Sequence, residues 1–292
     1  MIYDIRHLTT YEYASSVAFS HCALRLLPIA GPGQRVIETS IEIAPRPVEM
    51  AERTCFFGNR VTSITIESPH RVLTIDTRST VDVQRAPPPN ALATPPWGAV
   101  RDEACAIDSL DSLSPAHFVH ASRLVPDCSA AAEYAQRSFA ASGPILAAAI
   151  DLMRRIRDDF RYDPKATLVS TPLSEVFEKR RGVCQDFAHV MIAGLRALGF
   201  PAAYISGYLR TNPPAGSPRL AGADASHAWV SLWCGKNVGW VGLDPTNAML
   251  IGDDHIVLAR GRDYADISPV SGIILSSGDQ AVDVKVDVIA RV

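Results

Sequence analysis

The first 84 residues alternate apolar and polar side chains in six runs, from IYDIRHLTTYEY to RVLTIDTRSTVDVQ. The runs recur about every 12 residues and are separated by turn residues such as those at 31–33 and 58–59. A period of two is that of a strand with one buried face, and this spacing is typical of an antiparallel sheet or sandwich. We therefore expect a β-rich N-terminal domain over residues 1–85.

The next segment, APPPNALATPPWGAV at 86–100, has five prolines and no periodicity. Such a composition is typical of a stiff connector. We expect a proline-rich linker over 86–115 that separates two domains.

From about residue 116 the apolar period becomes helical. The run GPILAAAIDLMRRIRDDF carries an apolar stripe, a further helix is expected at 182–199, and three strand-like runs follow: AAYISGYLR, SHAWVSLWC and VGWVGLDPT. Helices followed by strands predict an α+β domain over 116–262. The tail at 263–292 alternates again, which predicts one or two closing strands.

The chain has 292 residues, of which 47% are hydrophobic and 20% charged, so it can bury a substantial core. Its net charge of −3 and the lack of a basic run argue against a nucleic-acid partner. The start of the chain has no apolar stretch of the kind found in signal peptides, and no run of 18 apolar residues occurs. We expect a soluble cytoplasmic protein without a membrane partner.

The six cysteines lie far apart and in no CxxC spacing, which argues against zinc knuckles and against a disulfide framework. Asp253, Asp254 and His255 could suggest a metal site, but two acids and a histidine in a loop are usually solvated. We expect no metal and no organic cofactor.

One cysteine is unusual in position. In RRGVCQDFAHVMIAGLRALGF, at 180–200, Gly182 can serve as N-cap and Gly199 as the glycine that ends the helix, so Cys184 falls in the first turn. Free N–H groups and the helix dipole favour a thiolate there. Cys184 also shares the apolar face of the helix with Ala188 and Met191, so a small core residue is an equal alternative.

A base for this thiol must come from outside the helix. His189 lies about 140° and Asp186 about 200° around the helix from Cys184, so Asp186 is expected to be a cap or supporting group. His227 begins one predicted strand and Asp244 ends the next, at a separation that brings both to the same end of a hairpin. A thiol, an imidazole and a carboxylate in this order can form a Cys–His–Asp triad.

The stretches GVCQDFAHVMIAGLRALGFPAAYISGYL, DASHAWVSLW and GWVGLDPTN closely resemble the bacterial transglutaminase-like family, whose members are often named as candidate cysteine proteases. The resemblance covers roughly 150–250, and the first 80 residues resemble the β-rich region that accompanies this core. It implies a papain-like α+β fold with Cys184 as nucleophile, His227 as general base and acid, and Asp244 orienting the histidine. It also makes Tyr162, in DFRYDP, a candidate wall of the site.

The chain departs from the family at the oxyanion hole. Animal transglutaminases supply a tryptophan from upstream of the cysteine, whereas here no tryptophan lies between the linker and Cys184, and Trp97 is too remote in sequence to assign. The backbone N–H of Cys184 can be one donor. The second donor stays open among Gln185, Tyr162 and a backbone group, and Trp229, which shares the strand face of His227, is a further site-wall candidate.

The expected chemistry is acyl transfer on an amide or peptide through a thioester, which water hydrolyses or an amine intercepts. We favour hydrolysis, as in a cysteine peptidase or amidase, because water is always present whereas crosslinking needs an amine channel. The alternatives are transamidation by a protein-glutamine gamma-glutamyltransferase and a catalytically silent scaffold that binds peptides. The expected partner is a peptide or protein substrate, with an amine acceptor for transamidation, and the segment 211–225 is expected to overhang the site.

Overall fold

The six alternating runs all form strands in the computed structural model, which describes residues 1–139, 142–211 and 225–291. In the first strand burial follows the alternation, since Tyr3, Ile5, His7 and Thr9 all point inward. This is the expected signature of strands with one buried face. The six strands are β1 (Ile2–Val17), β2 (Phe19–Leu24), β3 (Gln34–Ala44), β4 (Glu49–Thr54), β5 (Arg60–Ile66) and β6 (His70–Val83).

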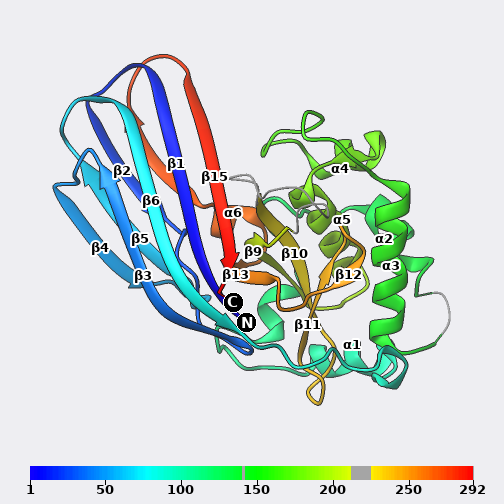
Figure 1. Cartoon of the computed structure of the whole chain (residues 1–292). Helices are drawn as coiled ribbons and strands as arrows, with labels where there is room; N and C mark the ends of the chain where they lie inside the picture. The colour runs from blue at the N-terminus through cyan, green and yellow to red at the C-terminus, as the bar shows by residue number, and fades with distance from the viewer. Residues whose placement is uncertain (140–141, 212–224, 292) are drawn as a thin grey trace, which may run out of the picture.

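The tail forms two strands, and both join the N-terminal sheets. Its strands β14 (Val270–Leu275) and β15 (Gln280–Ala290) pair with β2 and β1. The result is two antiparallel four-stranded sheets, in the orders β15-β1-β6-β3 and β14-β2-β5-β4, which we call the sandwich. Figure 1 shows both chain ends at the same edge of it.

The second half, which we call the core, is built on a five-stranded antiparallel sheet in the order β12-β11-β10-β9-β13. The predicted hairpin of β10 and β11 is confirmed, with Val230 opposite Leu243 and Trp233 opposite Trp240. The strands are β9 (Ala202–Leu209), β10 (Ala225–Trp233), β11 (Trp240–Asp244), β12 (Met249–Leu250) and β13 (His255–Gly261).

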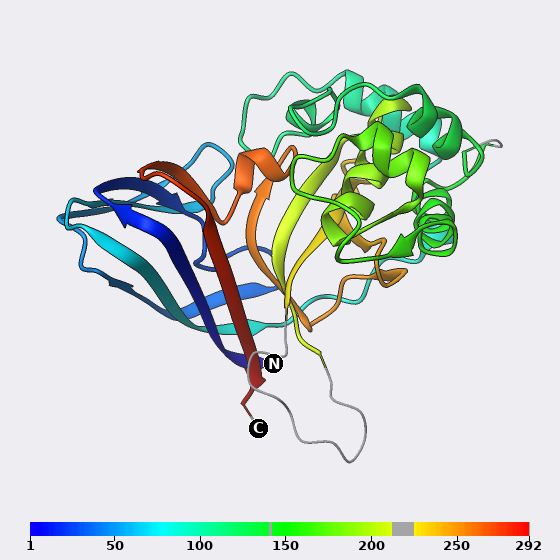
Figure 2. The same cartoon turned by 90° about the horizontal axis from the view of Figure 1, so that it is seen from above.

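Helices cover one face of this sheet and the sandwich covers the other (Figure 2). The most central helix is α5 (Cys184–Ala197), which buries most of its residues and packs Phe187 and Met191 into the same cluster as Ala228 and Val230 of β10. Among the described residues, no helix has the length and apolarity that crossing a membrane requires. Further helices after residue 115 are α2 (Ser129–Gln136), α3 (Ile145–Asp159), α4 (Leu173–Lys179) and the single turn α6 (Tyr264–Ile267).

The predicted linker contains regular structure. Within 86–115 lie a 3₁₀ turn (Ala91–Ala93) and the helix α1 (Trp97–Cys105), and a second 3₁₀ turn (Pro115–Phe118) begins at its end. Val100 and Ala104 are buried in the core, so this part of the segment is not a simple connector. Pro95 and Pro96 directly precede the first turn of α1, where no backbone donor is needed, and the helix is too short for its period to stand out.

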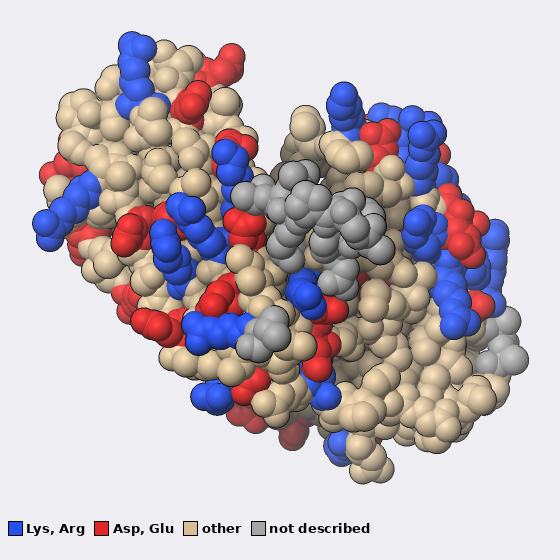
Figure 3. Space-filling model, in the orientation of Figure 1, with Lys and Arg blue, Asp and Glu red and all other residues tan. Residues whose placement is uncertain are grey.

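The sandwich and the core share a buried interface. Tyr208, Ile256 and Leu258 of the core form one apolar cluster with Tyr3 and Val286 of the sandwich. Buried polar groups fix the register: His7 hydrogen-bonds the Tyr208 hydroxyl at 2.7 Å, and the Asn59 amide pairs with both backbone groups of Arg260 at 2.7 Å. Figure 3 shows charges of both signs interspersed on this face and a notch between the two parts.

Gly207, opposite His227 in the sheet, tests this packing. A methyl group there would collide with the Ile256 carbonyl and the Trp229 ring, and a carbonyl within a sheet cannot move aside. We expect Gly207→Ala to lower the free energy of unfolding by about 3 kcal/mol in urea titrations. Gly98→Ala is the matched control, because its added methyl meets no atom within 4 Å; a loss of similar size there would contradict the explanation.

Candidate active site

Cys184 is the first residue of α5, as the sequence indicated, but the N-cap is Val183 and not Gly182. The Asp186 carboxylate turns back over the helix start, where it accepts hydrogen bonds from the Val183 N–H at 2.8 Å and the Thr167 hydroxyl at 2.6 Å. Asp186 is therefore a cap, as expected. Gly182 is needed for a different reason: a β-carbon there would overlap the Asp186 carboxylate.

His227 and Asp244 meet at the same end of the β10–β11 hairpin. The imidazole Nε2 donates to Asp244 Oδ2 at 2.7 Å, and the two side chains are 8% and 0% exposed. The other ring nitrogen, Nδ1, makes no contact with Asp244, and Cys184 lies near enough to His227 to raise the pKa of its ring. The structure thus brings together the three side chains that the sequence singled out.

The Asp244 carboxylate is held by its own turn. Its Oδ1 accepts from the backbone N–H groups of Thr246 at 2.9 Å and Asn247 at 3.1 Å, and its Oδ2 accepts from the Asn247 amide at 2.7 Å. An aspartate followed by Pro-Thr-Asn commonly folds back on its backbone in this way, and Pro245 ends the strand. Asn247 was missed at the sequence level, although the Asp-Pro-Thr-Asn turn was a usable signal.

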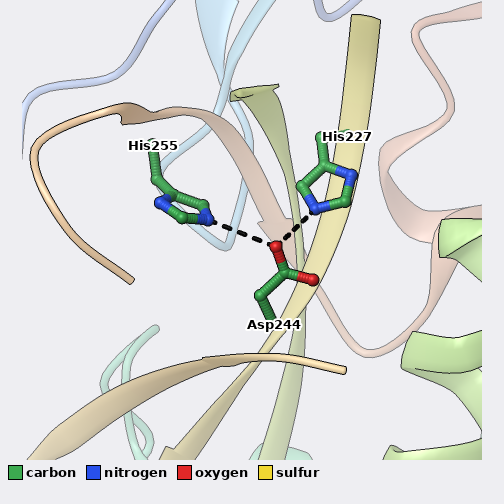
Figure 4. A group of neighbouring side chains, drawn as sticks. All are labelled: His227, Asp244 and His255. Carbon is green, nitrogen blue, oxygen red and sulfur yellow. Dashed lines mark hydrogen bonds and ion pairs between the residues drawn. The ribbon is translucent and has the colours of Figure 1, made fainter. Parts of the chain in front are cut away.

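A second histidine lies on the same carboxylate. His255, expected to be solvated, is completely buried, with Nε2 at 3.4 Å from Asp244 Oδ2 (Figure 4). Its Nδ1 accepts from the Gly252 N–H at 3.3 Å, so the proton must be on Nε2. Asp253 and Asp254 point to other partners, so the three neighbours in sequence do not converge on one site.

Hydrogen bonds account for this cluster without a cation. The ligand atoms of His227, Asp244 and His255 lie within 4.8 Å of one another, which makes them the set of described residues that could hold a metal ion. Both Asp244 oxygens, however, already accept hydrogen bonds, two on Oδ1 and three on Oδ2. Burying a carboxylate requires such donors, and they lower the pKa of Asp244 despite its burial.

The three site-wall candidates occupy different positions. Tyr162 is 48% exposed and pairs with Gly182 next to the helix start, and burial together with the charge of Cys184 raises the pKa of its hydroxyl. Gln185 follows Cys184 and is half-buried. Trp229 is fully buried with its ring against His255, so it supports the histidines from behind and does not form a wall that substrate could reach.

Two further expectations concern neighbouring parts of the chain. His189 faces away from the thiol: its ring packs on Tyr204, its Nε2 accepts from the Tyr264 N–H at 3.3 Å, and burial lowers its pKa to about 4. The segment 211–225, expected to overhang the site, lies almost entirely outside the described residues.

Comparisons with known proteins place both parts of the chain in one family. Residues 3–82 match the bacterial transglutaminase-like N-terminal region, and residues 132–245 match the transglutaminase-like superfamily. An uncharacterised protein of Mycobacterium tuberculosis is 40% identical over 98% of this chain and 92% of its own length.

Two further proteins are similar to this chain. A candidate cysteine protease from Cytophaga hutchinsonii has the same fold, with a TM-score of 0.76 at 21% identity over 100% of this chain and 91% of its own. A protein-glutamine gamma-glutamyltransferase of Pseudomonas aeruginosa is 32% identical over 32% of this chain and 15% of its own. The chain belongs to the bacterial transglutaminase-like family, a family of thiol-dependent acyl transfer.

Proposed function

We propose that the protein hydrolyses an amide or peptide bond through a thioester on Cys184. The observation that supports this most directly is the connected series of side chains from the buried Asp244 through His227 to a sulfur in the first turn of α5. A core cysteine would not require a buried imidazole and a buried carboxylate aligned behind it. Such a series is the arrangement by which a thiol is activated and its base oriented.

In the proposed reaction, the Cys184 thiolate attacks the carbonyl carbon, and the oxyanion accepts a hydrogen bond from the Cys184 backbone N–H. The tetrahedral intermediate collapses to a thioester as His227 gives its proton to the leaving amine. His227 then takes a proton from water, which attacks the thioester and releases the acid and the free thiolate. Asp244 keeps one ring nitrogen occupied throughout, so that Nδ1 always faces the sulfur.

The protonation state needed to start this cycle follows from the burial and contacts of His227. Burial alone would lower the pKa of His227, but the hydrogen bond to Asp244 and the nearby Cys184 outweigh it and raise that pKa to about 9. At neutral pH the imidazole is therefore charged beside the sulfur, which favours a thiolate–imidazolium pair. The helix N-terminus stabilises the same anion.

Transamidation is the second candidate, because part of the chain is similar to a gamma-glutamyltransferase. The two reactions use the same three residues and differ in whether water or an amine takes the acyl group. A catalytically silent peptide-binding scaffold is the third, and the three aligned side chains argue against it. Trapping the acyl-enzyme from a peptide pool, and identifying the released acid or amide by mass spectrometry, separates the three.

Activity in that assay should depend on the three residues unequally. Cys184→Ala should abolish turnover with the fold intact, and His227→Ala should do nearly the same. Asp244→Asn should lower turnover about 10- to 100-fold, the value of one hydrogen bond to a charged group. A fully active Asp244→Asn would show that this carboxylate does not orient the base.

Cysteine labelling tests the ion pair without a known substrate. At pH 6 iodoacetamide should modify Cys184 at least about tenfold faster than exposed Cys105, because an unassisted thiol is almost entirely protonated there. Cys22 and Cys234 should be slower still, since burial raises the pKa of both thiols. Equal rates at Cys184 and Cys105, measured by peptide mapping, would contradict the proposed thiolate.

The charged imidazole should also appear in the pH dependence of stability. Because the folded pKa of His227 is raised to about 9, its contribution is complete below the unfolded value near 6.5 and is lost as pH rises through 9. The free energy of unfolding, taken as wild type minus His227→Gln, should fall by about 3 kcal/mol between pH 6 and 9.5 in urea titrations. A difference that does not change with pH would mean that His227 is neutral in the folded protein.

A further inference from the structure

The loop that carries the second histidine is held by the sandwich side of the molecule. Arg85 follows β6 by two residues, and its guanidinium donates to the carbonyls of Gly252 at 3.1 Å and His255 at 2.8 Å. Its backbone N–H donates to Asp253 Oδ1 at 2.9 Å. One residue from outside the core therefore grips both ends of the segment 252–255, which leads into β13.

A second contact from the sandwich reinforces the first. The Tyr3 hydroxyl of β1 donates to Asp254 Oδ1 at 2.9 Å, and Arg210 reaches the same oxygen at 3.3 Å. Burial lowers the pKa of the Arg85 guanidinium, which is the sign of a charge held away from water. Keeping an arginine there costs desolvation, and the carbonyls of 252–255 offset it only while the loop keeps its shape.

The held shape determines where the His255 ring points. The Gly252 N–H fixes the tautomer, the ring edge packs on Trp229 with centroids 5.3 Å apart, and Nε2–H faces Asp244 Oδ2. Because Nδ1 accepts a hydrogen bond, the His255 ring donates to Asp244 as a neutral imidazole. It therefore stabilises the carboxylate without placing a second positive charge beside His227. Three donors, on His227, Asn247 and His255, then define one oxygen position.

We propose that His255 is a positioning residue for the Asp244–His227 pair, and that Arg85 makes the sandwich part of the catalytic apparatus by clamping the 252–255 loop. This inference rests on the proposed function, because it assigns these residues to the same reaction. It also gives the N-terminal region a role in this chain beyond covering the sheet: without it, the loop would lose its contacts to Arg85 and Tyr3 and with them the restraint on His255.

The groups around His227 define what a pH measurement reports. Cys184 faces it from α5, Asp244 from β11 and His255 from β13, while the charges of Arg85, Asp253 and Asp254 lie on the outer side of the loop. If His255 no longer holds the oxygen, the Asp244–His227 hydrogen bond lengthens. Burial then prevails, and the pKa of His227 falls.

The experiment follows the rate of Cys184 alkylation by iodoacetamide against pH in the full-length protein. Wild type should show its upper inflection, the loss of the His227 proton, near pH 9. His255→Phe keeps the ring packing but loses the donor, and Arg85→Met loses the clamp. In both variants, the upper inflection should move down by about one pH unit, the effect of losing one hydrogen bond to a charged group. With a substrate identified by acyl-enzyme trapping, kcat should fall about tenfold with little change in KM.

Three variants make the result specific. His255→Gln, whose amide can replace the Nε2–H donor, should restore most of the rate and the inflection. Arg85→Lys can reach only one carbonyl, so its inflection and rate should lie between those of wild type and Arg85→Met. It replaces Arg85→Met in the test if that variant does not fold. Asn59→Ala removes two hydrogen bonds across the same interface, at Arg260, and should lower the melting temperature without moving the inflection.

The outcomes distinguish the two proposals. A reactive Cys184 with unchanged inflections in His255→Phe and Arg85→Lys overturns the positioning role and leaves the proposed function standing. An upward shift of the inflection in these variants also overturns the positioning role, because it would mean that the only effect of His255 is to make the Asp244 carboxylate a weaker acceptor for His227. An equal downward shift of the inflection in Asn59→Ala would contradict a specific role of Arg85, because it would show that any weakening of the interface has the same effect. An unreactive wild-type Cys184 would instead overturn the proposed function.

Discussion

A carboxylate without contact to solvent is the constraint on which the rest of this structure depends. Asp244 is completely buried, and an ionised carboxylate in that position is tolerated only if its oxygens are fully engaged by donors. Its own turn supplies three of the five hydrogen bonds and two histidines supply the others. Because the histidines come from β10 and β13, at different places in the sheet, the charge can be stabilised only in the finished fold. The same requirement that keeps Asp244 ionised therefore fixes the ring of His227.

The chain order suits this requirement. The sandwich is built from both ends of the chain, and β13 is followed by α6 and then by β14 and β15, which return to pair with β2 and β1. Strand β13 is thus bounded by the core sheet on one side and by the sandwich on the other. The interface between them carries buried polar contacts as well as an apolar cluster, such as the pair of His7 and Tyr208. Such contacts fix a relative position more narrowly than apolar area alone does, since a displaced donor is left unpaired.

Much of this could be predicted from local patterns, and the failures share a cause. Alternation gave all six N-terminal strands, and the spacing of His227 and Asp244 implied a hairpin that would bring them together. The helical offset also excluded His189. His255 and Arg85 could not be recognised in this way, because their partners lie 11 and about 170 residues away and neither belongs to a periodic pattern. Strand parity alone placed Trp229 beside the site; it could not tell that the sandwich covers that face of the sheet.

The distribution of burial also determines which side of the site can meet a substrate. Cys184 and Tyr162 retain exposed surface, His227 retains little, and Asp244 and His255 have none. Exposure therefore decreases from Cys184 through His227 to Asp244, so in the proposed reaction a substrate approaches from the side of Cys184. Water cannot reach the Asp244–His227 hydrogen bond and weaken it, and the electrostatic effect of the carboxylate on the ring is correspondingly larger than it would be in solvent. In the proposed mechanism, an acyl group on Cys184 is attacked from the exposed side, and the nucleophile, water or an amine, gives its proton to His227.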